Sequence, residues 1–176
     1  LLHDLMRGKL DFLIGAKRKL PGDIGVKEES LLTESIVLLM PKHHPLSLKD
    51  EFDVAELLGF PWILPRASSP LRHTYEELFS SSQVPEPVNV VECNSLSASR
   101  VILENSNTLM LLSEAQARHE LMAGTLVSKR IKGFNAMRTI VLQYRSEALL
   151  TTTQLSLIEH IKKVALSEQH SENFSQ

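Results

Sequence analysis

The chain contains very little of several features that mark specialised proteins. It has a single cysteine, Cys93, and so no internal disulfide, which is typical of a reducing compartment. Its 19 Lys and Arg residues are outnumbered by 21 Asp and Glu residues, so it lacks the basic excess of a dedicated nucleic-acid-binding domain. Its longest apolar runs, 36–40 and 109–112, are far shorter than the ~20 residues of a membrane span, and no secretory signal opens the chain. These absences predict a soluble cytoplasmic α/β protein.

Catalytic and metal-binding motifs are also missing. The sequence has no Gly-x-Ser-x-Gly elbow, no Walker loop and no Gly-x-Gly-x-x-Gly fingerprint. His43 and His44 are adjacent, so on an extended segment they point to opposite sides, which favours a solvated turn over a metal site. His73, Glu76 and Glu77 share a helix face and could hold a metal, but solvated pairing is the commoner role of such neighbours. The sequence therefore predicts no metal, no cofactor and no enzyme active site.

Apolar periodicity and capping residues predict a chain of alternating strands and helices. Residues 61–124 alternate strand and helix three times, which favours a parallel sheet with right-handed crossovers. The strand over 10–15 is nearly all apolar, so we expect it to be buried on both faces. We expect the polar stretch 167–176 to fray. The other predicted elements are a short helix at 1–6, extended chain over 26–40, a short helix at 53–59, strands at 126–128 and 139–145, and a helix from about residue 152.

Small polar residues follow two successive strands of the central series. Ser68 and Ser69 follow one predicted strand, and Asn94 and Ser95 follow the next. The carboxyl ends of parallel strands share one edge, where helix N–H groups and the helix dipole favour anionic or hydroxyl-rich ligands. Helix capping alone accounts for each serine and is the commoner role. Two such junctions in succession nevertheless favour a binding crevice.

Three further residues near these junctions have two interpretations each. Arg66 and Arg72 flank the first junction and could contact an anion, although solvent exposure is usual for arginine. Cys93 ends a predicted buried strand, where an inert core thiol is the default; a role as nucleophile would need a nearby base, and the sequence does not place one.

Several short motifs also follow one another in a characteristic order. They are Leu-Met-Arg-Gly-Lys-Leu-Asp-Phe-Leu-Ile-Gly at 5–15, a strand ending in Pro-x-x-His-Pro-Leu at 32–46, Phe-Pro-Trp-Ile-Leu-Pro at 60–65, a strand ending in Glu-x-x-Ser at 87–95, and Leu-x-x-Gly-x-Leu at 121–126. In this order they resemble the effector-binding domain of LysR-type transcriptional regulators, over nearly the whole chain to about Ala165. The pieces at 61–65 and 69–72 lean toward the branch of galactose-binding-protein and aromatic-acid regulators.

This resemblance implies a periplasmic-binding-protein-like α/β fold of type 2, with two subdomains and an effector cleft between them. Subdomain I would comprise 1–58 and 125–166 without its opening elements, subdomain II would be 59–124, and 167–176 would be a polar tail. The family's winged helix-turn-helix and linker helix are absent from this sequence, so no DNA contact is assigned within the chain. The implied effector-binding residues are Gly15, Ala16, Lys17, Ser68, Ser69, Asn94 and Ser95.

The function implied by the resemblance is effector sensing and oligomerisation within a DNA-binding regulator. The effector would be small and anionic or hydroxyl-rich, such as a sugar acid or an aromatic or other organic acid. Such domains self-associate, which implies a dimer or tetramer, and they would reach DNA only through a domain outside this sequence. Two alternatives stay open: a solute-binding protein of a transport system with the same fold, and a small transferase or lyase that would need an acid–base residue such as Lys17.

Overall fold

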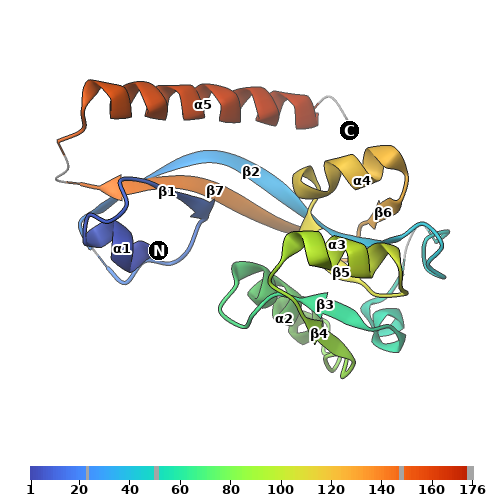
Figure 1. Ribbon diagram of the computed structural model, residues 1–176. Coiled ribbons are helices and arrows are strands. Elements are labelled where there is room, and N and C mark those ends of the chain that lie inside the picture. Colours follow the sequence, from blue (N-terminus) through green and yellow to red (C-terminus); the bar gives the residue numbers. More distant parts are fainter. Residues whose placement is uncertain (23, 50–51, 147–148, 174–176) are drawn as a thin grey trace. The chain divides into compact units, whose positions relative to one another are not determined.

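The computed structural model describes residues 1–22, 24–49, 52–146 and 149–173, and the chain forms two compact units (Figure 1). Unit 1 comprises Leu1–Glu34 and Arg138–Gln176, and unit 2 comprises Ser35–Met137. The elements in chain order are α1 (Leu2–Met6), β1 (Leu13–Ala16), β2 (Val26–Pro41), the 3-10 helix η1 (Val54–Gly59), β3 (Trp62–Leu64), α2 (Pro70–Ser81), β4 (Val90–Glu92), α3 (Leu96–Glu104), β5 (Met110–Ser113), the 3-10 helix η2 (Ala115–Ala117), α4 (Arg118–Ala123), β6 (Leu126–Lys129), β7 (Ala136–Arg145) and α5 (Thr152–Asn173).

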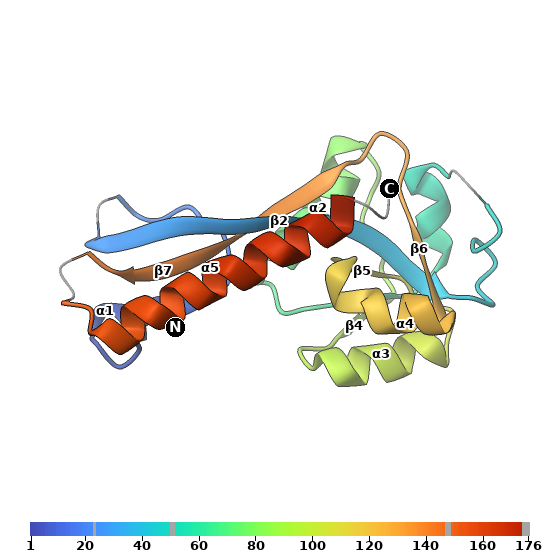
Figure 2. The same cartoon turned by 90° about the horizontal axis from the view of Figure 1, so that it is seen from above.

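Unit 1 is a small antiparallel sheet with one long helix against it. β1 pairs with β7, which neighbours β2. Figures 1 and 2 show α5 running along β7 and the first half of β2, and its Ile158 is 5% exposed. The predicted burial of the first strand on both faces is wrong, because Ile14 of β1 is 51% exposed. Within the described residues β1 pairs with β7 alone, so it is an edge strand.

Residues 167–173, for which fraying is predicted, are part of a helix. Helix α5 continues without a break to Asn173. No glycine or proline interrupts this stretch, and the hydroxyl of Ser167 donates to the carbonyl of Val164 at 2.7 Å. Residues 174–176 lie outside the described part of the chain.

Unit 2 contains both parallel and antiparallel strand pairs. β3 and β4 are parallel, and a parallel bridge between Trp62 and Leu109 places the chain entering β5 beside β3. The parallel arrangement predicted for 61–124 is therefore found among these three segments. It does not extend to every strand of the unit, because the second half of β2 is antiparallel to both β5 and β6.

Two apolar clusters pack against the strands of unit 2. Successive residues of a strand point to opposite faces, so Leu38 and Met40 of β2 join one cluster while Val37 and Leu39 join the other. The first cluster contains side chains of η1 and α2. It includes an aromatic group made of Trp62 of β3 with Tyr75 and Phe79 of α2, whose ring centroids lie 4.9 to 5.7 Å apart. The second contains residues of α3 and η2. This double-sided core fixes the strand ends that carry the candidate site.

The compact units do not follow the predicted subdomain boundaries. Residues 35–58 and 125–137 were expected in the first subdomain, but they lie in unit 2. The reason is strand pairing: β2 from Ile36 onward and β6 both belong to the sheet that contains β5, and their side chains fill the same two clusters. Among the helices that the structure describes, none combines the length and apolar character needed to cross a bilayer.

Candidate functional site

The carboxyl ends of β3, β4 and β5 lie at one edge of unit 2. Leu64 is paired with Glu92, so β3 and β4 end side by side. The N–H of Ile63 donates to the carbonyl of Leu109 at 2.9 Å, which places the start of β5 next to β3 in the same direction. The segments that follow these strands therefore share this edge, as expected for a parallel arrangement.

A side-chain hydrogen bond joins the first two of these segments. The N–H of Arg66 donates to Oδ1 of Asn94 at 3.0 Å, and the N–H of Cys93 donates to the carbonyl of Leu64 at 2.9 Å. The structure thus brings the loop containing Ser68 and Ser69 together with the loop containing Asn94 and Ser95. The predicted proximity of these two loops is confirmed, and their contact with an effector stays a prediction.

The serines that precede α2 and α3 have different roles. Ser95 caps α3, because its Oγ accepts the N–H of Ala98 at 3.3 Å. Ser69 occupies the same position before α2, followed by the predicted proline at N1, but its side chain makes no capping hydrogen bond. Within the described residues the half-buried hydroxyl of Ser69 has no hydrogen-bond partner. Capping explains Ser95 and leaves the Ser69 hydroxyl available.

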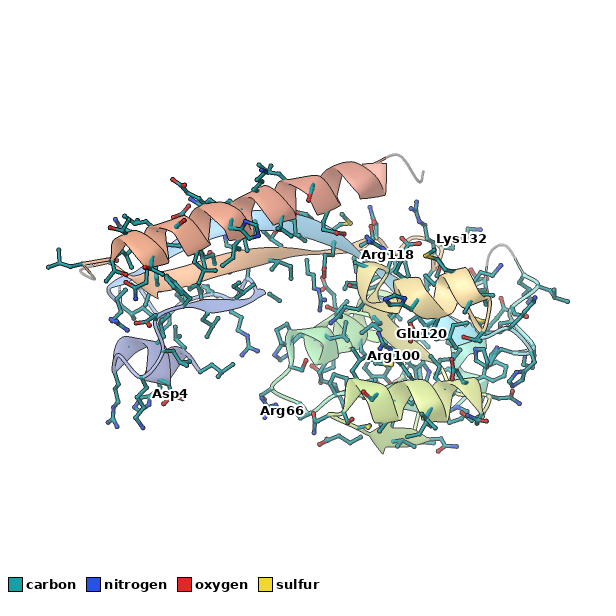
Figure 3. The ribbon with its side chains drawn as sticks, turned by 45° about the horizontal axis from the view of Figure 1, so that its top comes forward. Asp4, Arg66, Arg100, Arg118, Glu120 and Lys132 are labelled. Carbon is teal, nitrogen blue, oxygen red and sulfur yellow. The ribbon has the colours of Figure 1, made fainter. Side chains whose placement is uncertain are left out.

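At the end of β5, the polar side chains bind other parts of the protein. Ser113 is fully buried, and its Oγ accepts the N–H of Gln116 at 3.2 Å. Nε of Arg100 lies 3.0 Å from Oε1 of Glu120, and its guanidinium also donates to the carbonyl of Gln116. Figure 3 shows Arg100 and Glu120 facing each other between α3 and α4. Sequence reasoning missed this ion pair, because the two residues are 20 positions apart and belong to no motif.

The two arginines proposed for anion binding, Arg66 and Arg72, also have different surroundings. Arg66 is exposed and projects from the loop before α2, away from the body of unit 2 (Figure 3). The guanidinium of Arg72 pairs with Glu76 at 3.0 Å and with Glu86 at 3.8 Å, and it lies 5.5 Å from the ring centre of Tyr75. The suggested anion contact is therefore not supported for Arg72, whose charge is already neutralised.

The remaining predicted site residues belong to unit 1. Gly15 and Ala16 end β1, opposite Val141 and Ile140 of β7. Lys17 follows them, and its N–H donates to the carbonyl of Thr139 at 2.7 Å. Its Nζ lies 3.4 Å from Oε1 of Glu28, so the ammonium already has a carboxylate beside it.

The histidine and cysteine predictions have mixed outcomes. His44 was expected in a solvated turn, but it is only 2% exposed and its ring packs 4.4 Å from that of Phe60, so this prediction is wrong. Its Nδ1 accepts the N–H of Leu46 at 3.1 Å, which builds the turn after β2. Among the residues that the structure describes, no group of three or more His, Cys, Asp or Glu side chains could hold a metal. Cys93 is partly buried against the second apolar cluster of unit 2.

Comparison with known proteins identifies the family. Residues 1–166 match the model of the LysR substrate binding domain, so the chain belongs to this family of effector-binding regulatory domains and is not an enzyme. It is 30% identical over 169 residues to the HTH-type transcriptional regulator GalR of Pseudomonas putida, covering 96% of this chain and 42% of that protein. It is 25% identical over 127 residues to the regulator GbpR of Rhizobium radiobacter, covering 70% of this chain and 40% of that protein. The chain thus spans less than half the length of these two relatives.

Solved structures show the same fold. The regulatory domain of CcmR from Synechocystis PCC6803, in complex with 2-PG, matches with a TM-score of 0.79 at 19% identity, over 93% of this chain and 77% of that one. The effector-binding domain of QuiR, in complex with shikimate, matches with a TM-score of 0.76 at 14% identity, over 94% of this chain and 77% of that one. The mixed α/β architecture is therefore the LysR regulatory-domain fold.

Proposed function

We propose that this chain senses a small hydroxyl-rich or anionic effector through the seven residues predicted from the sequence. The observation that supports this most is the bond between Arg66 and Asn94, because it assembles four of the seven residues at one edge of unit 2. The other three end β1 in unit 1. That the effector lies in a cleft between two subdomains is part of the proposal and comes from the family resemblance.

The chemistry of the edge supports the proposed effector class. The N-termini of α2 and α3, with the positive ends of both helix dipoles, lie at this edge. Ser69 adds a hydroxyl that can both donate and accept a hydrogen bond. Arg66 adds an exposed cation. A carboxylate with neighbouring hydroxyl groups suits this set of donors.

The experiment is isothermal titration calorimetry of the chain with shikimate, D-gluconate and benzoate. Ser69→Ala tests the site, and Ser82→Ala is the matched control because Ser82 is the C-cap at the other end of the same helix. We expect at least one acid to bind the wild type and Ser69→Ala to weaken it by about fivefold, the effect of one neutral hydrogen bond. Ser82→Ala is expected to bind like the wild type. Equal affinity of Ser69→Ala and the wild type, or no binding of any acid, would contradict the proposed site.

The wider role proposed for the full protein is transcription regulation in the cytoplasm. Effector binding would favour one arrangement of the regulator over another, which requires a difference in affinity of about 1–3 kcal/mol between the two. DNA would be bound by a domain outside this sequence, and the chain would self-associate as a dimer or tetramer. Sedimentation equilibrium tests the self-association: a monomer at all accessible concentrations would contradict it.

A further inference from the structure

A compact charged cluster lies next to the end of β1 in unit 1. Nζ of Lys17 is 3.4 Å from Oε1 of Glu28, which is the third residue of β2. The other carboxylate oxygen, Oε2, accepts a hydrogen bond from Nε2 of Gln143 on β7 at 2.7 Å. Three strands therefore meet in one group with a cation, a carboxylate and an amide.

The carboxylate is the fixed member of this cluster. The side chain of Glu28 is 17% exposed and Gln143 is 5% exposed, so the bond between them is largely shielded from water. The ammonium of Lys17 is on the outside, since 58% of its side chain is exposed. A molecule that reaches Lys17 from solvent therefore meets a cation with a hydrogen-bonded, largely buried carboxylate beside it.

The next residue of β2 shows that this arrangement is not a general feature of the strand. Glu29 points to the opposite face, where it pairs with Lys162 of α5 and accepts a hydrogen bond from the hydroxyl of Tyr144 at 2.6 Å. These two contacts lower the pKa of Glu29. Glu29 thus helps to dock α5, whereas the partners of Glu28 are Gln143 and the predicted effector residue Lys17.

We infer that Glu28 determines which effectors the chain accepts. A hydroxyl group can accept a hydrogen bond from Nζ of Lys17 and donate one to Oε1 of Glu28. A carboxylate at the same place gains the lysine but is repelled by Glu28. The group bound at Lys17 is therefore a hydroxyl, and the effector is a polyhydroxylated monoacid in preference to a diacid. This inference rests on the proposed role of Lys17 in effector binding.

The test compares D-gluconate with D-glucarate, which differ only in a terminal hydroxymethyl group oxidised to a second carboxylate. Calorimetry on the wild type is expected to show at least about tenfold tighter binding of gluconate. Glu28→Gln removes the charge and retains a hydrogen-bonding side chain beside Gln143, so the preference is expected to fall to about threefold or less. Glu29→Gln is the matched control on the neighbouring residue and is expected to keep the wild-type preference.

The possible outcomes separate this inference from the proposed function. If Lys17→Met weakens gluconate binding but Glu28→Gln keeps the wild-type preference, the selectivity role of Glu28 is overturned and effector binding stands. If Lys17→Met leaves binding unchanged, the proposed site at the end of β1 fails, and the inference fails with it. A wild type that binds glucarate as tightly as gluconate, or that binds neither, also overturns the inference. In the last case, shikimate and benzoate still test effector binding.

Discussion

The main-chain nitrogen of Arg66 and the side-chain oxygen of Asn94 lie 3.0 Å apart, and this hydrogen bond joins the loops after β3 and β4. The two residues are 28 positions apart in the chain. The side chain of Asn94 thus connects the two loops, as a main-chain hydrogen bond between paired strand residues would. It leaves the N-termini of α2 and α3 close together without extending the sheet over them.

Replacing Asn94 by alanine is expected to loosen this junction. The change removes the acceptor for the Arg66 N–H, so we expect the free energy of unfolding to fall by about 1 kcal/mol. Urea denaturation of the chain measures this. Asn94→Asp retains an oxygen at the same place and is expected to preserve most of the stability. Equal losses in the two variants would show that the hydrogen bond is not what matters at this position.

Acidification is expected to destabilise unit 2 through His44. Burial is the main reason that the pKa of His44 is below its usual value of 6.5. In the unfolded chain the imidazole takes up a proton as the pH falls through 6.5, while the folded chain keeps it neutral with Nδ1 accepting the Leu46 N–H. The free energy of unfolding therefore falls as the pH drops below 6.5, down to the lowered pKa of the folded state.

The variant His44→Asn separates this effect from the rest of the acid response. It is expected to be less stable at neutral pH because it loses the ring contact with Phe60, but to lose less further stability between pH 7 and pH 5 than the wild type. His43→Asn is the control, since His43 is exposed. Parallel stability curves for the wild type and His44→Asn would contradict a role for His44.

Tyr75 offers a test of a buried hydroxyl. The residue is fully buried between Trp62 and Phe79, and its Oη has no hydrogen-bond partner within the described residues. Leaving a buried polar group unpaired costs stability, so Tyr75→Phe is expected to unfold at an equal or higher urea concentration, with a gain of up to about 1 kcal/mol. Tyr75→Leu, which disrupts the aromatic group, is expected to lower stability by about 2 kcal/mol or more.

Alkaline pH probes the same residue. Burial, together with the charge of Glu86, raises the pKa of Tyr75 to about 12. Above pH 10 the unfolded chain releases the phenol proton and the folded chain does not, so stability falls as the pH rises from 10 toward 12. We expect Tyr75→Phe to reduce this fall, as measured by denaturation at pH 9 and pH 11. An identical fall in both proteins would contradict the assignment.

The ion pair between Glu34 and Arg138 is expected to couple β2 to β7 in unit 1. Nε of Arg138 lies 2.6 Å from Oε2 of Glu34. The side chain of Arg138 is only 23% exposed, and that of Glu34 is only 12% exposed. A double-mutant cycle with Glu34→Gln and Arg138→Met is expected to give a coupling energy of about 1–2 kcal/mol, more than an exposed pair provides. The pair of Lys17 and Glu28 is not a suitable control because it belongs to the proposed site. Additive effects of the two substitutions would refute the coupling.

Much of the local structure followed from short-range signals. Ser69 and Ser95, for which helix capping is the commoner role, are each followed directly by a helix, α2 and α3. Gly124 directly follows α4 and adopts a left-handed φ of +70°. These signals act over a few residues, where backbone sterics and capping bonds decide the conformation.

Properties set by distant parts of the chain were harder to predict. The antiparallel direction of β2 against β5 depends on a pairing between residues such as Ile36 and Ser113, which no local pattern encodes. The burial of His44 depends on Phe60, and the neutralisation of Arg72 depends partly on Glu86. The candidate site shows the same division: its serines were visible in the sequence, while the Asn94 bond that assembles them and the Glu28 carboxylate beside Lys17 were not.

The uninterrupted course of the chain through unit 2 has a consequence for how such proteins can be rearranged. Oγ of Ser35 and Sδ of Met137, at the two ends of this unit, lie 3.5 Å apart. A segment whose first and last residues meet can be exchanged between homologous genes as one cassette, because the recipient needs no rerouting of its backbone. Swapping residues 35–137 is therefore a simple route to chimaeras in which unit 2 comes from one homologue and unit 1 from another.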